Sequence, residues 1–196
     1  NLETLVNRFG PQSPERTVSI LAQVCDSLWD AHQTGLIHRD IKPANIFVCR
    51  YGHALDVVKV LDFGLVKIYE DGAASDVKLT RGDTTTGTPA YMAPEMALGE
   101  KEIDARADIY GLGCVAYWLL TGHMVFEHET PMKVAMAHVR EPLIMQCLAK
   151  EPAERPPSAD ALREALLACG LADGWTADRA TRWWQTNDPE TTRAAA

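Results

Sequence analysis

Residues 38–45, HRDIKPAN, constrain the fold of this chain most strongly, because they form a polar segment held between apolar elements. The proline in this segment keeps it out of the interior of a helix or a central strand, so we expect a loop. Two short runs rich in β-branched residues follow, at 46–48 and 57–61, with a glycine between them. We expect these runs to pair as a hairpin. The pairing would bring Asn45, before the first strand, next to Asp62, after the second.

The remaining periodic segments predict helices. Apolar residues recur at three- and four-residue steps from Val18 to His32, after Ser13-Pro14, a typical helix start. Residues 108–121 are apolar on nearly all sides, which predicts a buried central helix. The chain should therefore be mainly α-helical with one small β-hairpin. Further helices are expected at 2–9, 131–140, 143–149 and 158–169, and in the tail that carries Trp175, Trp183 and Trp184.

The bulk composition excludes several classes of protein. With 19 Lys and Arg against 27 Asp and Glu, the formal charge of −8 argues against a general binder of nucleic acid or of anionic membranes. The five cysteines are scattered singly with no CxxC pair, so no zinc site is indicated and reduced thiols are expected. The longest apolar run, 109–120, is shorter than the ~20 residues that span a bilayer. We expect no membrane segment in this chain and a cytoplasmic location, with any anchor lying elsewhere in a longer parent protein.

The loop and the hairpin gather the groups that phosphoryl transfer needs. Asp40 is the candidate that accepts or orients the proton of an acceptor hydroxyl. Lys42 can reach a transferring phosphate as a point charge. Asn45 and Asp62 offer the oxygen ligands that Mg²⁺ prefers, and Gly64 gives the turn after Asp62 its conformational freedom. Taken alone, each of these residues has an ordinary structural explanation as a cap or turn residue.

Three sequence blocks occur in an order that is specific for one family: HRDIKPAN at 38–45, DFG at 62–64 and APE at 93–95. At this spacing the chain resembles the catalytic half of a eukaryotic-type serine/threonine protein kinase, of the bacterial eukaryotic-like type. The resemblance implies the C-terminal lobe (C-lobe) of the protein-kinase-like α+β fold, with the N-terminal lobe (N-lobe) absent. It also implies transfer of the γ-phosphate of ATP to Ser or Thr hydroxyls of protein substrates, with Mg²⁺, or Mn²⁺ in its place, as the metal.

The resemblance assigns roles to residues around the catalytic aspartate. Lys42 would act in catalysis and contact the γ-phosphate. Asn45 and Asp62 would hold the metal ion and, through it, the nucleotide. Phe47 would form an apolar floor beneath the adenine ring. Thr88 would dock the acceptor residue and, together with Lys42, is similar to the serine/threonine-specific branch of the family.

Residues 70–88 are polar and rich in glycine and threonine, which is typical of a mobile loop. The resemblance implies that this loop is the activation loop. Arg39, beside the catalytic aspartate, implies control by phosphorylation, since a phosphate on the loop could pair with its guanidinium. Thr84 matches the usual phosphate position best, with Thr85 and Thr86 close behind.

Other residues are implied to be structural. Arg155 would pair with Glu95 as a buried ion pair. Asp108 would accept hydrogen bonds from the backbone of the HRD motif, and a place as an N-cap carboxylate of the central helix is compatible with that role. His38 would be a packed core histidine rather than a base, with Phe63 stacked against it.

Two features depart from the family's pattern. No glycine-rich loop or strand lysine precedes residue 38, so half of the ATP cleft is missing, and we expect this chain alone to lack appreciable kinase activity. About twenty residues of a family loop and helical turn are also missing near Pro142-Leu143. The expected domains are a kinase C-lobe portion at 1–170, shortened near 142–143, and a helical C-terminal extension and tail at 171–196.

Two other functions stay open. A truncated kinase lobe could be a non-catalytic binding module that presents Trp175, Trp183 and Trp184, although ordinary packing fits these side chains better. A kinase-like lobe could also belong to a small-molecule phosphotransferase, but Lys42 and the docking segment 87–95 argue against it. The acceptor, peptide or small molecule, would separate the enzymes, and a glycine-rich loop upstream would exclude the binding module.

Overall fold

The computed structural model describes residues 1–63, 89–140 and 146–188. These residues form a mainly helical fold with a two-stranded antiparallel sheet, which confirms the predicted fold class. The α-helices are α1 (Leu2–Phe9), α2 (Pro14–Gln33), α3 (Pro94–Ala97), α4 (Arg106–Thr121), α5 (Pro131–Arg140), α6 (Ala159–Ala168) and α7 (Ala177–Asn187). The strands are β1 (Ile46–Tyr51) and β2 (Ala54–Val60), and the short 3-10 turns are η1 (Pro43–Asn45), η2 (Pro89–Tyr91), η3 (Gln146–Leu148), η4 (Pro152–Glu154) and η5 (Ala172–Gly174).

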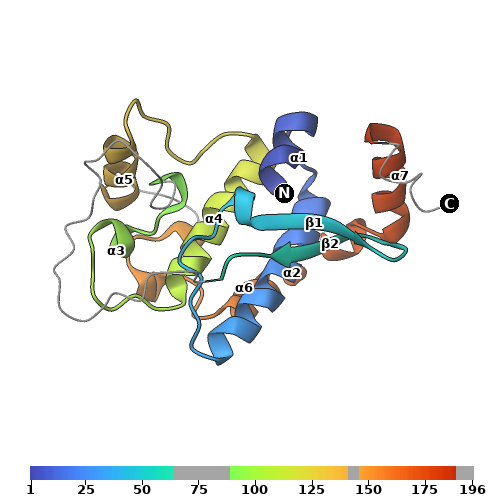
Figure 1. Cartoon of the computed structure of the whole chain (residues 1–196). Coiled ribbons are helices and arrows are strands. Elements are labelled where there is room, and N and C mark those ends of the chain that lie inside the picture. Colours follow the sequence, from blue (N-terminus) through green and yellow to red (C-terminus); the bar gives the residue numbers. More distant parts are fainter. Residues whose placement is uncertain (64–88, 141–145, 189–196) are drawn as a thin grey trace.

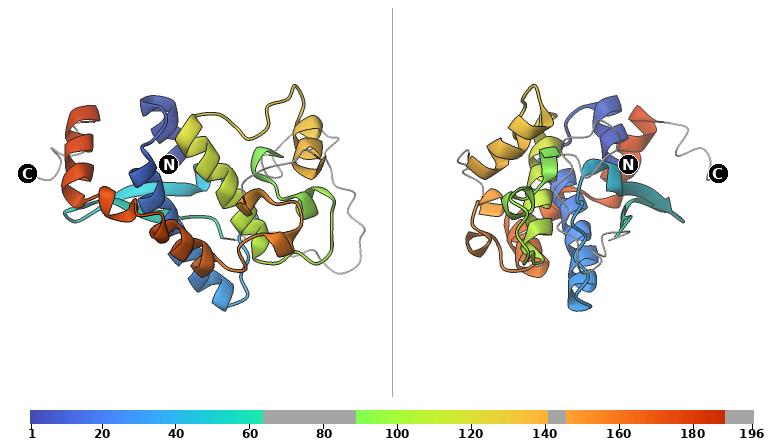
Figure 2. Two further views of the ribbon diagram at one scale, coloured as in Figure 1. Left: turned by 180° about the vertical axis from the view of Figure 1, so that it is seen from behind. Right: turned by 60° about the vertical axis from the view of Figure 1, so that its left-hand side comes forward.

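Helices α2 and α4 lie in the middle of the molecule, and the hairpin lies beside them (Figure 1). Helices α3 and α5 lie at one end, whereas α7 lies at the opposite end, close to α1 and the hairpin (Figures 1 and 2). Strand β2 of the hairpin packs against α2 on one side and against α7 of the C-terminal extension.

Helix α2 begins where the sequence predicts. The side chain of Ser13 accepts a hydrogen bond from the backbone N–H of Arg16 at 3.3 Å, and a proline occupies the first turn. This N-cap satisfies one of the free backbone N–H groups of the first turn. After the helix, Gly35 has φ 76°, so the chain can reverse toward the catalytic loop at low steric cost.

The hairpin is longer than the β-branched runs suggest. Ile46 pairs with Val60 and Phe47 with Lys59, and the ladder continues past a bulge to the turn at Gly52. The second strand begins three residues before the predicted 57 and ends at Val60, because cross-strand pairing recruits residues of low strand propensity.

Helix α4 forms the centre of the core, as predicted, although it begins at Arg106 rather than at residue 108. Two of its glycines allow neighbouring segments to approach closely. A Cβ on Gly111 would lie 3.1 Å from both Cβ and the carbonyl oxygen of Ile41, and one on Gly113 would lie 2.8 Å from Cβ of Cys147. The catalytic loop therefore packs directly on the backbone of the central helix.

The predicted helix at 143–149 is wrong in its described part. Residues 141–145 lie outside the described residues, and Gln146–Leu148 form the 3-10 turn η3. Leu148 is fully buried against α4, so its apolar character reported burial and not a helical period.

None of the helices in the described ranges is both long enough and apolar enough to cross a membrane.

Candidate active site

The carboxylate of Asp108 holds the backbone of the catalytic loop. It accepts hydrogen bonds from the backbone N–H groups of His38 at 2.9 Å and Arg39 at 2.7 Å, and Nε2 of His32 lies 2.8 Å from it. Asp108 is 1% exposed and lies in the first turn of α4, whose N-cap is Ala105, so it holds the loop without being the N-cap of the helix. The two backbone bonds help to hold Arg39 at φ 64°, a left-handed conformation that costs free energy in a non-glycine residue.

His38 is buried and packs as the sequence predicts. Its Nδ1 accepts a hydrogen bond from the backbone N–H of Asp40 at 3.2 Å, so Nε2 carries the proton and donates to the carbonyl oxygen of Leu61 at 2.9 Å. The ring centroid of Phe63 lies 4.8 Å from that of the imidazole. Both imidazole nitrogens are therefore occupied: Nδ1 braces the loop itself, and Nε2 joins the loop to the residue after β2.

Asp40 lies between two residues that fix its carboxylate. Nζ of Lys42 lies 2.7 Å from Oδ2 of Asp40, and Nδ2 of Asn45 donates to the same Oδ2 at 3.1 Å and to the backbone carbonyl of Asp40 at 2.9 Å. The Asp40 side chain keeps 39% exposure, so a substrate hydroxyl can reach it. The Lys42 contact also places one positive charge beside the carboxylate, where a phosphate would add negative charge.

Asn45 and Asp62 are neighbours, as the hairpin predicts. The backbone N–H of Leu61 donates to the carbonyl oxygen of Asn45 at 2.9 Å, directly before Asp62. Asp62 has φ 62° and is exposed, and among the described residues its carboxylate has no hydrogen-bond or ion-pair partner. With Nδ2 of Asn45 donating to Asp40, Oδ1 of Asn45 is also left available.

This donor set fits Mg²⁺. Carboxylate and amide oxygens are its preferred protein ligands, and Mg²⁺ usually takes only one or two of them, with waters and substrate phosphates completing its coordination. No cluster of three or more His, Cys, Asp or Glu side chains suited to a metal occurs in ranges 1–63, 89–140 and 146–188. A metal at Asn45 and Asp62 would therefore depend on phosphate oxygens for the rest of its shell.

Glu95 and Arg155 form the buried ion pair that the sequence predicts. Arg155 also donates to the backbone carbonyls of Ala149 at 2.8 Å, Lys150 at 2.9 Å and Arg106 at 3.1 Å. The guanidinium thus ties the APE segment to the start of α4 and to the chain after η3.

Of the remaining predicted site residues, two belong to the described part of the chain and five lie outside it. Phe47 lies half-buried on β1, opposite Lys59. The side chain of Arg39, which precedes Asp40, is exposed. Residues outside the described ranges are Gly64, Thr84, Thr85, Thr86 and Thr88.

Sequence reasoning missed a buried polar cluster behind the hairpin. Arg16 of α2 forms an ion pair with Asp56 of β2, and the indole N–H groups of Trp175 and Trp184 also donate to Asp56. The tail tryptophans were expected to pack, but nothing in the pattern around Asp56 indicated their partner. A tryptophan's single N–H usually finds an acceptor when buried, and this rule was the only available signal.

The chain matches the protein kinase domain family over residues 1–182. It therefore belongs to the protein kinase family. The matched region runs through the catalytic loop and the hairpin and ends within α7.

The relatives confirm the resemblance to bacterial serine/threonine kinases. The chain is 37% identical over 183 residues to serine/threonine-protein kinase PknB of Mycobacterium tuberculosis, covering 85% of this chain and 28% of that protein. It is 38% identical over 187 residues to serine/threonine-protein kinase pkn3 of Myxococcus xanthus, covering 86% of this chain and 34% of that protein. The chain thus spans about a third of the length of these relatives, or less.

Proposed function

We propose that this chain carries the catalytic loop and the metal-binding hairpin of a serine/threonine protein kinase. The reaction is transfer of the γ-phosphate of ATP to Ser or Thr hydroxyls of protein substrates, in the cytoplasm. The observation that supports it most directly is the carboxylate of Asp40, held by Lys42 and Asn45 and partly open to solvent.

In the proposed reaction, Asp40 accepts the proton of the substrate hydroxyl as its oxygen forms a bond to the γ-phosphorus and the bond from that phosphorus to the β-phosphate oxygen breaks. Nζ of Lys42, already 2.7 Å from Asp40, offers a positive charge to the transferring phosphate. Oδ1 of Asn45 and the carboxylate of Asp62 would hold Mg²⁺, which supplies further counter-charge to the phosphates when bound.

Regulation by phosphorylation is part of the proposal. The exposed guanidinium of Arg39 has no ion-pair partner within the described part of the chain, so it is available to a phosphate on the loop that contains Thr84, Thr85 and Thr86. Mass spectrometry of the active full-length protein should find phosphate between residues 80 and 86. Full activity with an unmodified loop would count against this mechanism.

The test of the function is radiolabelled phosphate transfer from ATP by the full-length gene product. Wild-type protein should label a Ser/Thr peptide, and Asp40→Ala should reduce the rate by at least ~10²-fold, the scale of a general base. Asp30→Ala, at an exposed aspartate of α2, is the matched control and should keep wild-type activity.

Two results would redirect the assignment. Labelling of choline or an aminoglycoside instead of the peptide would indicate a small-molecule phosphotransferase. No transfer to any acceptor would favour a binding module. The 196-residue chain alone is expected to show no appreciable transfer, and Asp40-dependent transfer by it would contradict that expectation.

A further inference from the structure

A buried ion pair between Arg16 and Asp56 lies behind the hairpin, and the proposed reaction assigns no role to it. Nε and one terminal nitrogen of Arg16 each donate to Asp56 at 2.9 Å, and the two side chains are 0% and 3% exposed. The other terminal nitrogen of Arg16 donates to Oε1 of Gln12 at 2.8 Å. Burial lowers the pKa of Arg16, whereas hydrogen bonding and charge from Asp56 act in the opposite direction.

Three tryptophans of the C-terminal extension enclose this pair. Nε1 of Trp175 donates to Oδ2 of Asp56 at 2.9 Å, and Nε1 of Trp184 donates to Oδ1 at 2.6 Å. The guanidinium carbon of Arg16 lies 3.8 Å from the ring centroid of Trp183. We call Trp175, Trp183 and Trp184, with Arg16 and Asp56, the tryptophan clamp.

The clamp satisfies the Asp56 carboxylate almost completely. Its two oxygens accept four hydrogen bonds, two from Arg16 and two from indole N–H groups. Each donor removed from a buried carboxylate costs stability, since it leaves part of the charge unsatisfied. The C-terminal extension therefore stabilises the buried ion pair through two hydrogen bonds and does more than shield it from solvent.

The backbone of β2 is held at the same point. Nε2 of Gln23 donates to the carbonyl oxygen of Asp56 at 3.0 Å, and Oε1 of Gln23 accepts from the backbone N–H of Val58 at 3.0 Å. Asp56 has φ 60°, a conformation that needs such support in a non-glycine residue. Side-chain and backbone bonds thus fix the direction in which β2 leaves Asp56.

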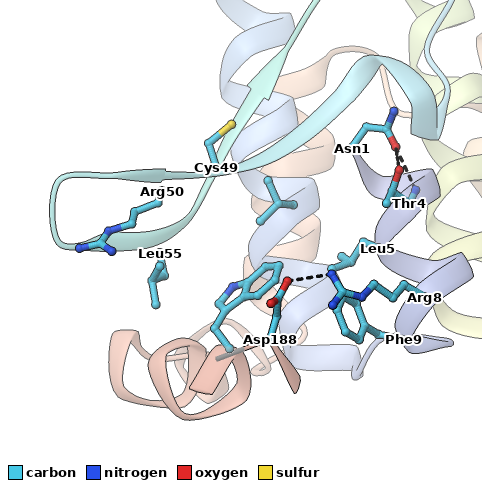
Figure 3. Close-up of a pocket in the computed structure, with 11 residues that line it drawn as sticks. Asn1, Thr4, Leu5, Arg8, Phe9, Cys49, Arg50, Leu55 and Asp188 are labelled. Atoms are coloured by element: carbon cyan, nitrogen blue, oxygen red, sulfur yellow. Dashed lines mark hydrogen bonds and ion pairs between the residues drawn. The ribbon is translucent and has the colours of Figure 1, made fainter. Parts of the chain in front are cut away.

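A second set of contacts fixes α7 from the other side. The Phe9 ring packs edge-on against Trp183, with ring centroids 5.0 Å apart. Figure 3 shows Arg8 of α1 reaching Asp188, just beyond the end of α7, across a cavity of about 220 Å³ that is also lined by Cys49 and Leu55. The Arg8 side chain is 58% exposed, so this 2.9 Å ion pair adds little and the buried clamp dominates.

Strand β2 connects the clamp to the proposed metal site. The chain runs from Asp56 along β2 to Val60, the partner of Ile46, and beyond the strand to Leu61, which donates to Asn45, and to Asp62. Residues 57–60 are paired with β1, and six residues of strand span at most roughly 20 Å, so a change of direction at Asp56 is carried along the ladder toward Asp62.

We propose that the tryptophan clamp positions β2, and through it Asp62 relative to Asn45. Arg16, Asp56, Trp175 and Trp184 are positioning residues that touch neither nucleotide nor substrate. The part of the proposal that concerns the metal rests on the proposed kinase function, whereas the part that concerns β2 does not.

The first test is hydrogen exchange, followed by mass spectrometry, on the 196-residue chain. Trp184→Phe and Trp175→Phe each keep an aromatic ring but remove one indole N–H. We expect peptides that cover residues 57–61 to exchange roughly tenfold faster in both variants, with α4 peptides unchanged, since the opening is local. Two controls should leave exchange unaltered: Trp29→Phe, at a 38% exposed tryptophan of α2, and Arg8→Ala.

Two exchange results overturn the clamp. Unchanged exchange in 57–61 shows that the indole hydrogen bonds do not hold β2. Equal acceleration in β2 and α4 shows general destabilisation. Because Trp175→Phe and Trp184→Phe each remove one of four donors, failure of one variant to fold still leaves the other to decide.

The second test is the Mg²⁺ dependence of phosphate transfer by the full-length gene product. We expect the Mg²⁺ concentration at half-maximal rate to rise about three- to tenfold in the clamp variants, below the 10–100-fold typical of direct outer-shell partners of a metal ligand. A variant that is merely less folded loses maximal rate at an unchanged midpoint, and that result overturns the link to the metal. Absence of transfer by the wild type is instead a failure of the proposed function, and the exchange result then judges the clamp alone.

Discussion

Glu95 and Arg155, sixty residues apart in sequence, are joined by two parallel hydrogen bonds of 2.6 and 2.8 Å in the interior of the lobe. Their side chains are 5% and 0% exposed. A planar guanidinium matches a carboxylate in this geometry, and the pair therefore fixes both the distance and the orientation of the APE segment relative to α4.

Removing one member of this pair should destabilise the chain strongly. We expect Arg155→Met to lower the free energy of unfolding by about 3–5 kcal/mol, because the Glu95 carboxylate stays buried without its partner. Urea denaturation measures the loss. The double variant Arg155→Met with Glu95→Leu should be less destabilised than Arg155→Met alone. Arg106→Ala, which breaks the exposed pair with Asp104, is the control and should cost at most about 1 kcal/mol.

Asp108→Asn should loosen the catalytic loop. The asparagine amide replaces one carboxylate oxygen with an NH₂ donor, which then faces the backbone N–H of either His38 or Arg39, so one buried N–H loses its acceptor. We expect a loss of about 2–3 kcal/mol in the free energy of unfolding. The amides of residues 38 and 39 should also exchange faster in NMR experiments. Asp30→Asn, at an exposed position of α2, should change neither, and slow exchange at 38 and 39 in Asp108→Asn would contradict the assigned role.

His138 predicts a fall in stability at mildly acidic pH. It is fully buried, and desolvation, with the nearby Lys150 charge, lowers its pKa from 6.5 to about 4. Between these two values the unfolded chain binds more protons than the folded one, so stability is fully present above pH 6.5 and declines as pH falls toward 4. The decline amounts to about 3 kcal/mol at 1.36 kcal/mol per pH unit.

The measurement is chemical denaturation across pH 4 to 7. His138→Gln should flatten this part of the stability profile, although it loses the 2.7 Å hydrogen bond to the Tyr110 hydroxyl and is less stable at pH 7. A profile as steep in the variant as in the wild type would show that other groups are responsible.

Gly113→Ala should destabilise the lobe even though alanine favours helices. The added Cβ would lie 2.8 Å from Cβ of Cys147 and 3.0 Å from Cδ2 of Leu148, closer than carbon atoms approach. Overpacking of this kind costs about 1–3 kcal/mol, which exceeds the gain in helix propensity. Thermal denaturation should show a lower Tm, and a Tm equal to or above that of the wild type would mean that η3 shifts at no cost. The matched control is Gly170→Ala, where no atom lies within 4 Å but φ is 69°, so any loss there reports backbone strain instead.

From the sequence, the residues of the candidate site could be predicted more completely than the bounds of the helices and strands. The hairpin beside the HRD loop follows from its β-branched runs, whereas the Asp108 and Arg155 contacts were implied by the resemblance to protein kinases, which rests on the motifs and their spacing. The helix expected at 143–149 failed in its described part, since a short apolar segment reports burial equally well for a helix and for a turn. The strand ends failed by a few residues because pairing, not propensity, decides where a ladder stops.

By itself the sequence determined the family, the order of the elements and the candidate catalytic residues Asp40, Lys42, Asn45 and Asp62. These features depend on local patterns and on motif order, which are readable along one chain. Only the tertiary structure decided that Asp56 meets Arg16, 40 residues away, and Trp175 and Trp184, 119 and 128 residues away. Contacts of this kind leave no period in the sequence, because a buried carboxylate needs only donors close in space, and folding alone decides which segments supply them.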